Sequence, residues 1–406
     1  MVSTFTWLDF SESERQQAMQ VLDLFREQST LDELGFAPIR DAFADHFFPG
    51  TSTIQTRARY FLFVPWIIAR SEKPGIQSDG FLNRVRYNET KLIKALLEGD
   101  PHQSGIIGRE AKGTLKRMPS AVYWRGLHLW GIRLFDGSID QFAREREYQR
   151  QQERKSLVTD DGEPVQHYPS LWCPDLPPAP EGLLDSVTFQ LTEDESKFLA
   201  TRICSKQPHS ALAQILMAAK GPIDSNSIWD TQLQAIFTAK TSKAIEFARR
   251  FAGCAWGGSL VYTRMVALLK GGCDELVEAI DQKLQDWQQH LELEASVLHQ
   301  WDLDDFWSLI RQLNPRLTEQ TRQFADAWIE VSRKVADGNP AWKEPDVTEL
   351  IRRREVRLKG YRARLRPENL RARDRWQGSV TSGPMDYRWS QSRTVLNDIL
   401  TPSSDN

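Results

Sequence analysis

The residues best suited to bind a ligand are the arginines near the C-terminal end of the sequence. Residues 346–378 contain 11 Lys or Arg and 5 Asp or Glu, so this segment carries +6 while the rest of the 406-residue chain sums to −9. Arginine is always charged and can grip a phosphate through two parallel N–H groups. This concentration of guanidinium groups predicts a phosphate-binding surface for DNA or RNA.

The same segment has the apolar periodicity of a helix that packs on the rest of the protein. At about 100° per residue its apolar side chains fall within a stripe about 100° wide. The stripe contains Val347, Leu350, Ile351, Leu358, Tyr361 and Leu365. Pro367 is expected to end the helix, since proline disfavours helical geometry in the residue before it. The candidate nucleic-acid-binding residues line the two flanks, with Arg353, Arg357 and Arg364 on one and Arg352, Lys359, Arg362 and Arg366 on the other.

Arg354 falls inside the apolar stripe and is expected to be buried. A buried guanidinium needs a carboxylate or several carbonyls, and we predict that Arg354 forms an ion pair with an acidic group of another helix. Two other interpretations of the segment stay open. Its arginines either pair with acidic residues of the same chain, leaving a solvated helix, or face an acidic protein partner.

A second candidate for phosphate binding lies at residues 51–59, where threonines, a serine and Gln55 surround Arg57 and Arg59. Free N–H groups at a helix start, together with hydroxyls and guanidinium groups, suit a phosphate. We therefore add Arg57 and Arg59 to the nucleic-acid-binding candidates. The alternative is ordinary helix capping, with both arginines paired to Asp41 or Asp45.

The sequence offers no recognisable catalytic centre. Asp41, Asp45 and His46 share a helix face by spacing, but a divalent metal usually needs more ligands. The glycines at 108 and 113 have the spacing of a phosphate-cradling loop, yet Thr114 replaces its lysine. Zinc-hydrolase, serine-hydrolase and phospholipase D-type motifs are absent. We therefore expect no catalytic residue, no metal and no cofactor, with a metal-dependent nuclease assembled from scattered residues as the alternative.

Composition and periodicity predict an all-α protein, a multidomain helical bundle with at most a few short strands. Hydrophobic residues make up 40% of the chain and charged residues 26%, and the 14 tryptophans are expected to anchor cores. Helices are expected at 40–48, from 51–60 onward, at 110–135 with an interruption near Pro119, and at 235–265 with an interruption at Gly257–Gly258. A capped helix start is expected at 11–14, a capping box at 192–195 and one short strand at 186–191.

The domain organisation is read from a proline-rich stretch. Residues 156–181 hold six of the 20 prolines and are expected to link a helical domain at 1–155 to a second one at 182–345, with the basic helix and tail at 346–406 packed on the body. The four cysteines are widely spaced, and neither a signal peptide nor an apolar run long enough for a bilayer is visible. We expect a cytoplasmic protein with no membrane contact.

Several blocks of the sequence resemble a bacterial family of unknown function. The blocks are 3–12, 40–45, 48–66, 119–124, 130–133, 246–251, 387–389 and 398–399. They are spread over the whole chain, so the resemblance implies one full-length unit. The chain departs from the expected pattern at Cys254 and Trp256, where small or aliphatic residues are expected, and at Thr263, where Asn is expected.

The resemblance also implies a biological setting. Families of this kind occur near helicase-like and phospholipase D-like genes in bacterial defence islands. We therefore expect a non-catalytic subunit of a nucleic-acid-handling, anti-phage system, with DNA or RNA and a helicase or nuclease subunit as partners. A structural adaptor whose arginines are all internally paired is the remaining alternative.

Overall fold

The structure, a computed structural model, describes residues 32–73, 76–111, 115–155, 169–376 and 383–403. Across these residues it contains sixteen α-helices, two 3-10 helices and no strand. Extended segments there contribute isolated bridges, which join Arg133 to Trp172 and Thr192 to Ser403. None of the described helices combines the length and apolar character needed to cross a bilayer. The predicted all-α fold class is confirmed.

The described residues divide into two compact units that each combine distant stretches of sequence. The first unit contains those within Met1–Ala42 and Glu246–Met385, and the second those within Phe43–Ile245 and Asp386–Asn406. Two helices, α2 (Ala37–Phe47) and α10 (Ala239–Lys270), therefore contribute residues to both units. The contiguous domains expected around the proline-rich stretch stay a prediction.

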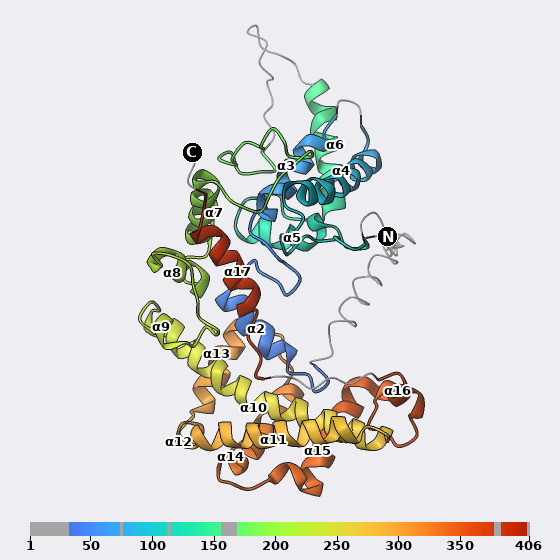
Figure 1. Cartoon of the computed structure of the whole chain (residues 1–406), viewed down its shortest axis with the longest axis vertical. Helices are drawn as coiled ribbons and strands as arrows, with labels where there is room; N and C mark the ends of the chain where they lie inside the picture. The colour runs from blue at the N-terminus through green and yellow to red at the C-terminus, as the bar shows by residue number, and fades with distance from the viewer. Residues whose placement is uncertain (1–31, 74–75, 112–114, 156–168, 377–382, 404–406) are drawn as a thin grey trace, which may run out of the picture. The chain divides into compact units, whose positions relative to one another are not determined.

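The first unit is a helical bundle with a tryptophan-rich core. Besides parts of α2 and α10 it contains α11 (Asp274–Leu293), α12 (Ala295–His299), α13 (Leu303–Leu313), α14 (Glu319–Ala336), η3 (Ala341–Lys343), α15 (Pro345–Lys359), η4 (Gly360–Arg362) and α16 (Leu370–Asp374). α11 packs against α14, and the pair lies alongside α10 in Figure 1. The rings of Trp287 and Trp328 stack at 6.2 Å between centroids in this core. The indole N–H of Trp307 donates to Asp326 at 2.6 Å, so its polar end is satisfied as well.

Two glycines inside α10 serve close packing and do not break the helix. An interruption was predicted at Gly257–Gly258, yet α10 runs through both residues. A Cβ on Gly257 would lie 2.1 Å from the Trp287 ring, and one on Gly258 would lie 3.2 Å from Phe36. The absence of side chains lets these bulky rings approach the α10 backbone, which offsets the poor helix propensity of glycine.

The second unit combines the C-terminal helix with helices from the first half and the middle of the chain. Besides parts of α2 and α10 it contains α3 (Tyr60–Ser71), α4 (Ser78–Gly99), α5 (Pro119–Leu129), α6 (Ile139–Lys155), α7 (Glu193–Lys206), α8 (Ala211–Ala218), α9 (Thr231–Gln234) and α17 (Trp389–Leu400). α3 packs against α4 and α5, and α17 packs against α7 and α8, as Figure 1 shows. Phe61 stacks on Trp130 with ring centroids 3.7 Å apart in the core of this unit.

The helix expected to open within 51–60 begins only at Tyr60. Residues 51–59 form turns because distant groups hold their backbone. The Asp398 carboxylate of α17 accepts from the N–H of Ala58 at 2.8 Å, and the Tyr123 hydroxyl accepts from the N–H of Thr56 at 2.9 Å. These contacts satisfy amides that would otherwise have to be satisfied by helix formation.

Of the remaining local predictions, the capping box is confirmed, whereas the long helix and the short strand are not. The capping box is present, with Thr192 Oγ1 accepting from the N–H of Glu195 and the Glu195 carboxylate accepting from the N–H of Thr192, both at 3.2 Å. Of the helix expected at 110–135, the described residues (110–111 and 115–135) form only α5. Residues 186–191 form no strand, and the Leu191 carbonyl accepts from both the N–H and the hydroxyl of Ser403. The helix start expected at 11–14 lies outside the described residues.

Candidate nucleic-acid interface

α15 carries the first part of the arginine-rich segment, and it ends earlier than predicted. It starts at Pro345, which suits the first helical position, and stops where Gly360 adopts φ +57°. Pro367 therefore does not end the helix. Near this end of the helix the predicted apolar stripe is not buried: Leu358 is 44% exposed and Tyr361 is 83% exposed. Beyond Lys359 the chain forms η4 and an irregular turn that leads to α16.

A buried carboxylate on α15 holds this turn. The Glu355 side chain is 0% exposed and accepts from the hydroxyl of Tyr262 at 2.9 Å. It also accepts from the backbone N–H groups of Arg364 at 2.9 Å and Leu365 at 2.8 Å. A buried carboxylate is costly unless its oxygens are satisfied. Here the bonds that satisfy it also fix the path of the chain after the helix.

Two more side chains clamp the turn from its other end. The Arg373 guanidinium of α16 is 3% exposed and donates to the carbonyls of Arg364, Arg366 and Pro367 at 2.6–2.8 Å. The Asn369 amide donates to the carbonyls of Tyr361 and Ala363, both at 2.9 Å. We call residues 360–369 the clamped loop. Its backbone is fixed by buried or half-buried polar groups from both of its ends.

Several arginines of the segment are paired with carboxylates of the same unit. Arg352 and Arg353 both contact Glu349, with nitrogen–oxygen distances of 2.6 Å. Their hydrogen bonds lower the pKa of Glu349 from 4.5 to about 2, so this carboxylate stays charged even in acid, where an ordinary glutamate becomes protonated. Both pairs lie within α15, so these two arginines are neutralised by a carboxylate of their own helix.

Glu33 neutralises a second pair of basic residues. Arg364 Nη1 lies 2.6 Å from its carboxylate, and Lys359 contacts the same group. Arg366 and Glu368 are 3.5 Å apart at the edge of the clamped loop. Lys359, Arg364 and Arg366 are therefore less available to an external phosphate than the sequence suggested.

A smaller set of arginines faces solvent. Arg357, Arg362, Arg371 and Arg375 are exposed and contact no carboxylate among the described residues. We call these four arginines the exposed basic surface. Arg353 adds to it in part, because its side chain is 77% exposed despite its contact with Glu349. Arg371 and Arg375 were not among the predicted binding residues, although their spacing of four on a helix places them on one face.

Arg354 is buried as predicted, but its hydrogen-bond acceptors among the described residues are neutral. It is 5% exposed and donates to the carbonyls of Leu34 at 2.8 Å and Gln320 at 3.3 Å, and to the Thr321 hydroxyl at 3.0 Å. Its guanidinium also lies 5.0 Å from the centroid of the Phe324 ring. The predicted ion pair is thus replaced, within the described residues, by neutral acceptors and an aromatic face.

Arg57 and Arg59 lie in the second unit, where both form internal ion pairs. Arg57 contacts the Asp398 carboxylate through Nε and Nη2 at 2.7–3.0 Å. Arg59 Nη2 lies 2.7 Å from Glu195, and both of those side chains are buried. The acidic partners are not Asp41 and Asp45, as the capping alternative supposed. We leave Arg57 and Arg59 out of the proposed interface.

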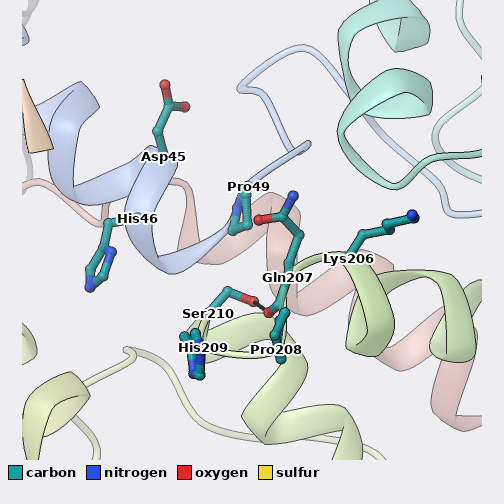
Figure 2. Close-up of a pocket in the computed structure, with 8 residues that line it drawn as sticks. All are labelled: Asp45, His46, Pro49, Lys206, Gln207, Pro208, His209 and Ser210. Carbon is teal, nitrogen blue, oxygen red and sulfur yellow. Dashed lines mark hydrogen bonds between the residues drawn. The ribbon is translucent and has the colours of Figure 1, made fainter. Parts of the chain in front are cut away.

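The second unit also has a pocket of about 250 Å³, drawn in Figure 2 and lined by Asp45, His46, Pro49, Lys206, Gln207, Pro208, His209 and Ser210. Two of its polar side chains are already paired. Asp45 contacts Arg388 at 2.6 Å, and the Ser210 hydroxyl donates to the Gln207 carbonyl at 2.8 Å. Burial lowers the pKa of His46 below its usual value. No group of three His, Cys, Asp or Glu side chains among the described residues is placed to hold a metal ion.

Comparison with known proteins identifies the family without assigning an activity. The chain belongs to a family of unknown function, DUF6361, whose model matches residues 2–401. The match covers nearly the whole chain, as the distributed resemblance implied. No curated protein and no solved structure matches it.

Proposed function

We propose that this member of a family of unknown function is a non-catalytic nucleic-acid-binding subunit, and that it contacts phosphates through the exposed basic surface. One observation carries the proposal: Arg357, Arg362, Arg371 and Arg375 are exposed without a carboxylate partner in the described residues. An arginine without an intramolecular acid keeps its donors free for a bidentate contact with phosphate.

The way the chain holds this surface supports the proposal. Glu355 and Arg373 are buried ionisable groups whose hydrogen bonds go largely to the backbone of one surface loop. Surface loops are usually the most mobile parts of a protein, and fixing one with buried charges is costly. Fixing the loop holds Arg362 in one arrangement between α15, which carries Arg357, and α16, which carries Arg371. This reduces the conformational entropy lost when a ligand binds.

The wider role is proposed from the family resemblance. We place the protein in a bacterial defence system, beside a helicase or nuclease subunit that supplies the chemistry. The apolar side chains next to the basic surface, Leu358 and Leu370, are 44% and 62% exposed and suit a protein contact. A metal-dependent nuclease, the alternative from the sequence, is favoured by no specific arrangement of the described side chains.

The test is nucleic-acid binding by two variants that lose the same number of positive charges. One replaces the exposed basic surface with alanine: Arg357→Ala, Arg362→Ala, Arg371→Ala and Arg375→Ala. The matched control replaces four exposed cations elsewhere in the first unit: Arg311→Ala, Arg316→Ala, Lys334→Ala and Lys343→Ala. We expect the first variant to lose most of its affinity and the control to keep it. Equal losses in both would overturn the proposal, because they would reflect net charge alone.

A further inference from the structure

Tyr361 presents an aromatic ring to solvent in the middle of the arginine-rich segment. Its side chain is 83% exposed, whereas most large aromatic residues of the described chain are buried. It lies in η4, directly before Arg362 and four residues after Arg357 in the sequence. Leaving a tyrosine ring in water forgoes the stabilisation that burial would give it. An exposed ring at this position therefore adds little to the stability of the fold, and a contact with a ligand would explain it better.

The backbone under Tyr361 is fixed on both sides. Gly360, with φ +57° and ψ −124°, turns the chain out of α15 in a conformation that is largely reserved for glycine. The Asn369 amide holds the Tyr361 carbonyl at 2.9 Å. The ring is thus carried by a defined turn of the clamped loop. A rigid aromatic side chain with few rotatable bonds loses little entropy when it contacts a ligand.

Other exposed tyrosines of the described residues have different surroundings. Tyr87, at 59% exposure, has the Lys91 ammonium 5.1 Å from its ring centroid on the same helix. Tyr148, at 53%, lies on the polar helix α6. Tyr361 is distinguished by guanidinium groups without acidic partners on both sides of it along the chain. An exposed flat ring with arginines before and after it in the sequence matches a ligand in which flat bases alternate with negatively charged phosphates.

From this arrangement we infer that the exposed basic surface takes single-stranded nucleic acid, with an unpaired base stacked on Tyr361 and the flanking phosphates on Arg357 and Arg362. The inference rests on the proposed function and specifies its substrate. In a duplex the base faces are already stacked on each other, so only phosphates and groove edges are offered. In a single strand every base has a free face, and stacking on an aromatic side chain is tolerant of sequence.

The experiment compares a labelled oligothymidylate with a mixed-sequence DNA duplex of the same length by fluorescence anisotropy. The proteins are the wild type, Tyr361→Ala, Tyr361→Phe and the quadruple arginine variant. We expect the single strand to bind more tightly than the duplex. Tyr361→Ala is expected to weaken single-strand binding about five- to 150-fold, the range typical of one stacked base, and to leave duplex binding unchanged. Tyr361→Phe keeps the ring and is expected to retain the affinity.

Each contrary outcome is informative. Equal binding of both nucleic acids, unaffected by Tyr361→Ala but abolished in the quadruple variant, overturns the inference and leaves the proposed function standing. Loss of affinity in Tyr361→Phe to the same extent as in Tyr361→Ala points to the hydroxyl and also overturns stacking. Binding of neither nucleic acid by the wild type removes both proposals, and the surface is then a protein contact. Thermal unfolding of every variant is the control that shows whether the fold is retained.

Discussion

The Glu355 carboxylate accepts from the backbone N–H of Leu365 at 2.8 Å, and through this bond a buried charge on α15 fixes the first residues beyond the helix. Sequence periodicity placed both residues on one continuous helix. In the structure the helix ends at Gly360, and the chain folds back so that Glu355 can bind its backbone. The clamped loop and the arginines beside it depend on this relationship.

Removing the carboxylate should therefore destabilise the first unit. We expect Glu355→Ala to lower the free energy of unfolding by about 2–4 kcal/mol, because two backbone N–H groups and the Tyr262 hydroxyl lose their acceptor. Asp346→Ala is the matched control, an exposed acid on the same helix. Urea unfolding measures both. A loss for Glu355→Ala no larger than that of Asp346→Ala would contradict the role assigned to Glu355.

The pairing of Arg352 and Arg353 with Glu349 predicts that one substitution should increase nucleic-acid affinity. Glu349→Gln removes the charge that holds both arginines and should free them for phosphate. We expect tighter DNA binding and a salt dependence steeper by about 0.7–0.9 for each additional phosphate that the variant binds. Asp346→Asn removes the same charge without freeing an arginine and controls for net charge. If both variants tighten binding equally, Glu349 has no masking role.

A buried carboxyl in the second unit predicts a pH dependence of stability. Glu89 on α4 is 1% exposed and accepts from the N–H of Ser120 at 2.6 Å, next to the start of α5. Burial raises its pKa from 4.5 to about 7. The folded protein therefore binds a proton that the unfolded chain releases at lower pH. The stability contribution of the neutral form is full below about pH 4.5 and is lost as the pH rises through about 7.

Glu89→Gln should remove this dependence, since the amide is neutral at every pH and its carbonyl can still accept from Ser120. The free energy of unfolding of the variant should rise relative to wild type between pH 5 and pH 8, by at most about 1.4 kcal/mol per pH unit. Glu98→Gln, on the exposed side of the same helix, is the control. A constant difference between Glu89→Gln and wild type across this range would refute the prediction.

The ion pair between Arg57 and Asp398 predicts that substitutions at these two positions, which are distant in the sequence, have non-additive effects on the free energy of unfolding. It joins the turn before α3 to α17, and the Asp398 side chain is 8% exposed. A double-mutant cycle with Arg57→Ala and Asp398→Ala should give a coupling free energy of about 1–3 kcal/mol. Urea unfolding of the two single variants and the double variant provides it. Additive effects would mean that the pair contributes nothing beyond its separate residues.

The sequence correctly predicted features that depend only on residues close together along the chain. The capping box at Thr192 and Glu195 needs only four consecutive positions, and it was identified correctly. The burial of Arg354 followed from its place in an apolar stripe. Its partners did not, because the Leu34 carbonyl belongs to a segment 320 positions away.

The wrong predictions of helix ends and breaks also arise from contacts with residues that are distant in the sequence. Gly257 was expected to break a helix, but the residue that explains it is Trp287 of α11. The late start of α3 depends on Asp398, from the far end of the chain. Within the candidate interface, the sequence identified the charge but not which arginines stay exposed. Glu33, which pairs with Arg364, lies 331 positions away, so only the folded chain brings the two together.

The most direct test of the account is the salt dependence of nucleic-acid affinity. Each phosphate that a variant no longer binds should make the plot of log binding constant against log salt concentration shallower by about 0.7–0.9. We predict that the quadruple variant at Arg357, Arg362, Arg371 and Arg375 has a slope smaller than wild type by about 3, while the quadruple control at Arg311, Arg316, Lys334 and Lys343 keeps the wild-type slope. Identical slopes for wild type and the quadruple arginine variant would contradict the proposal that these four arginines bind phosphate.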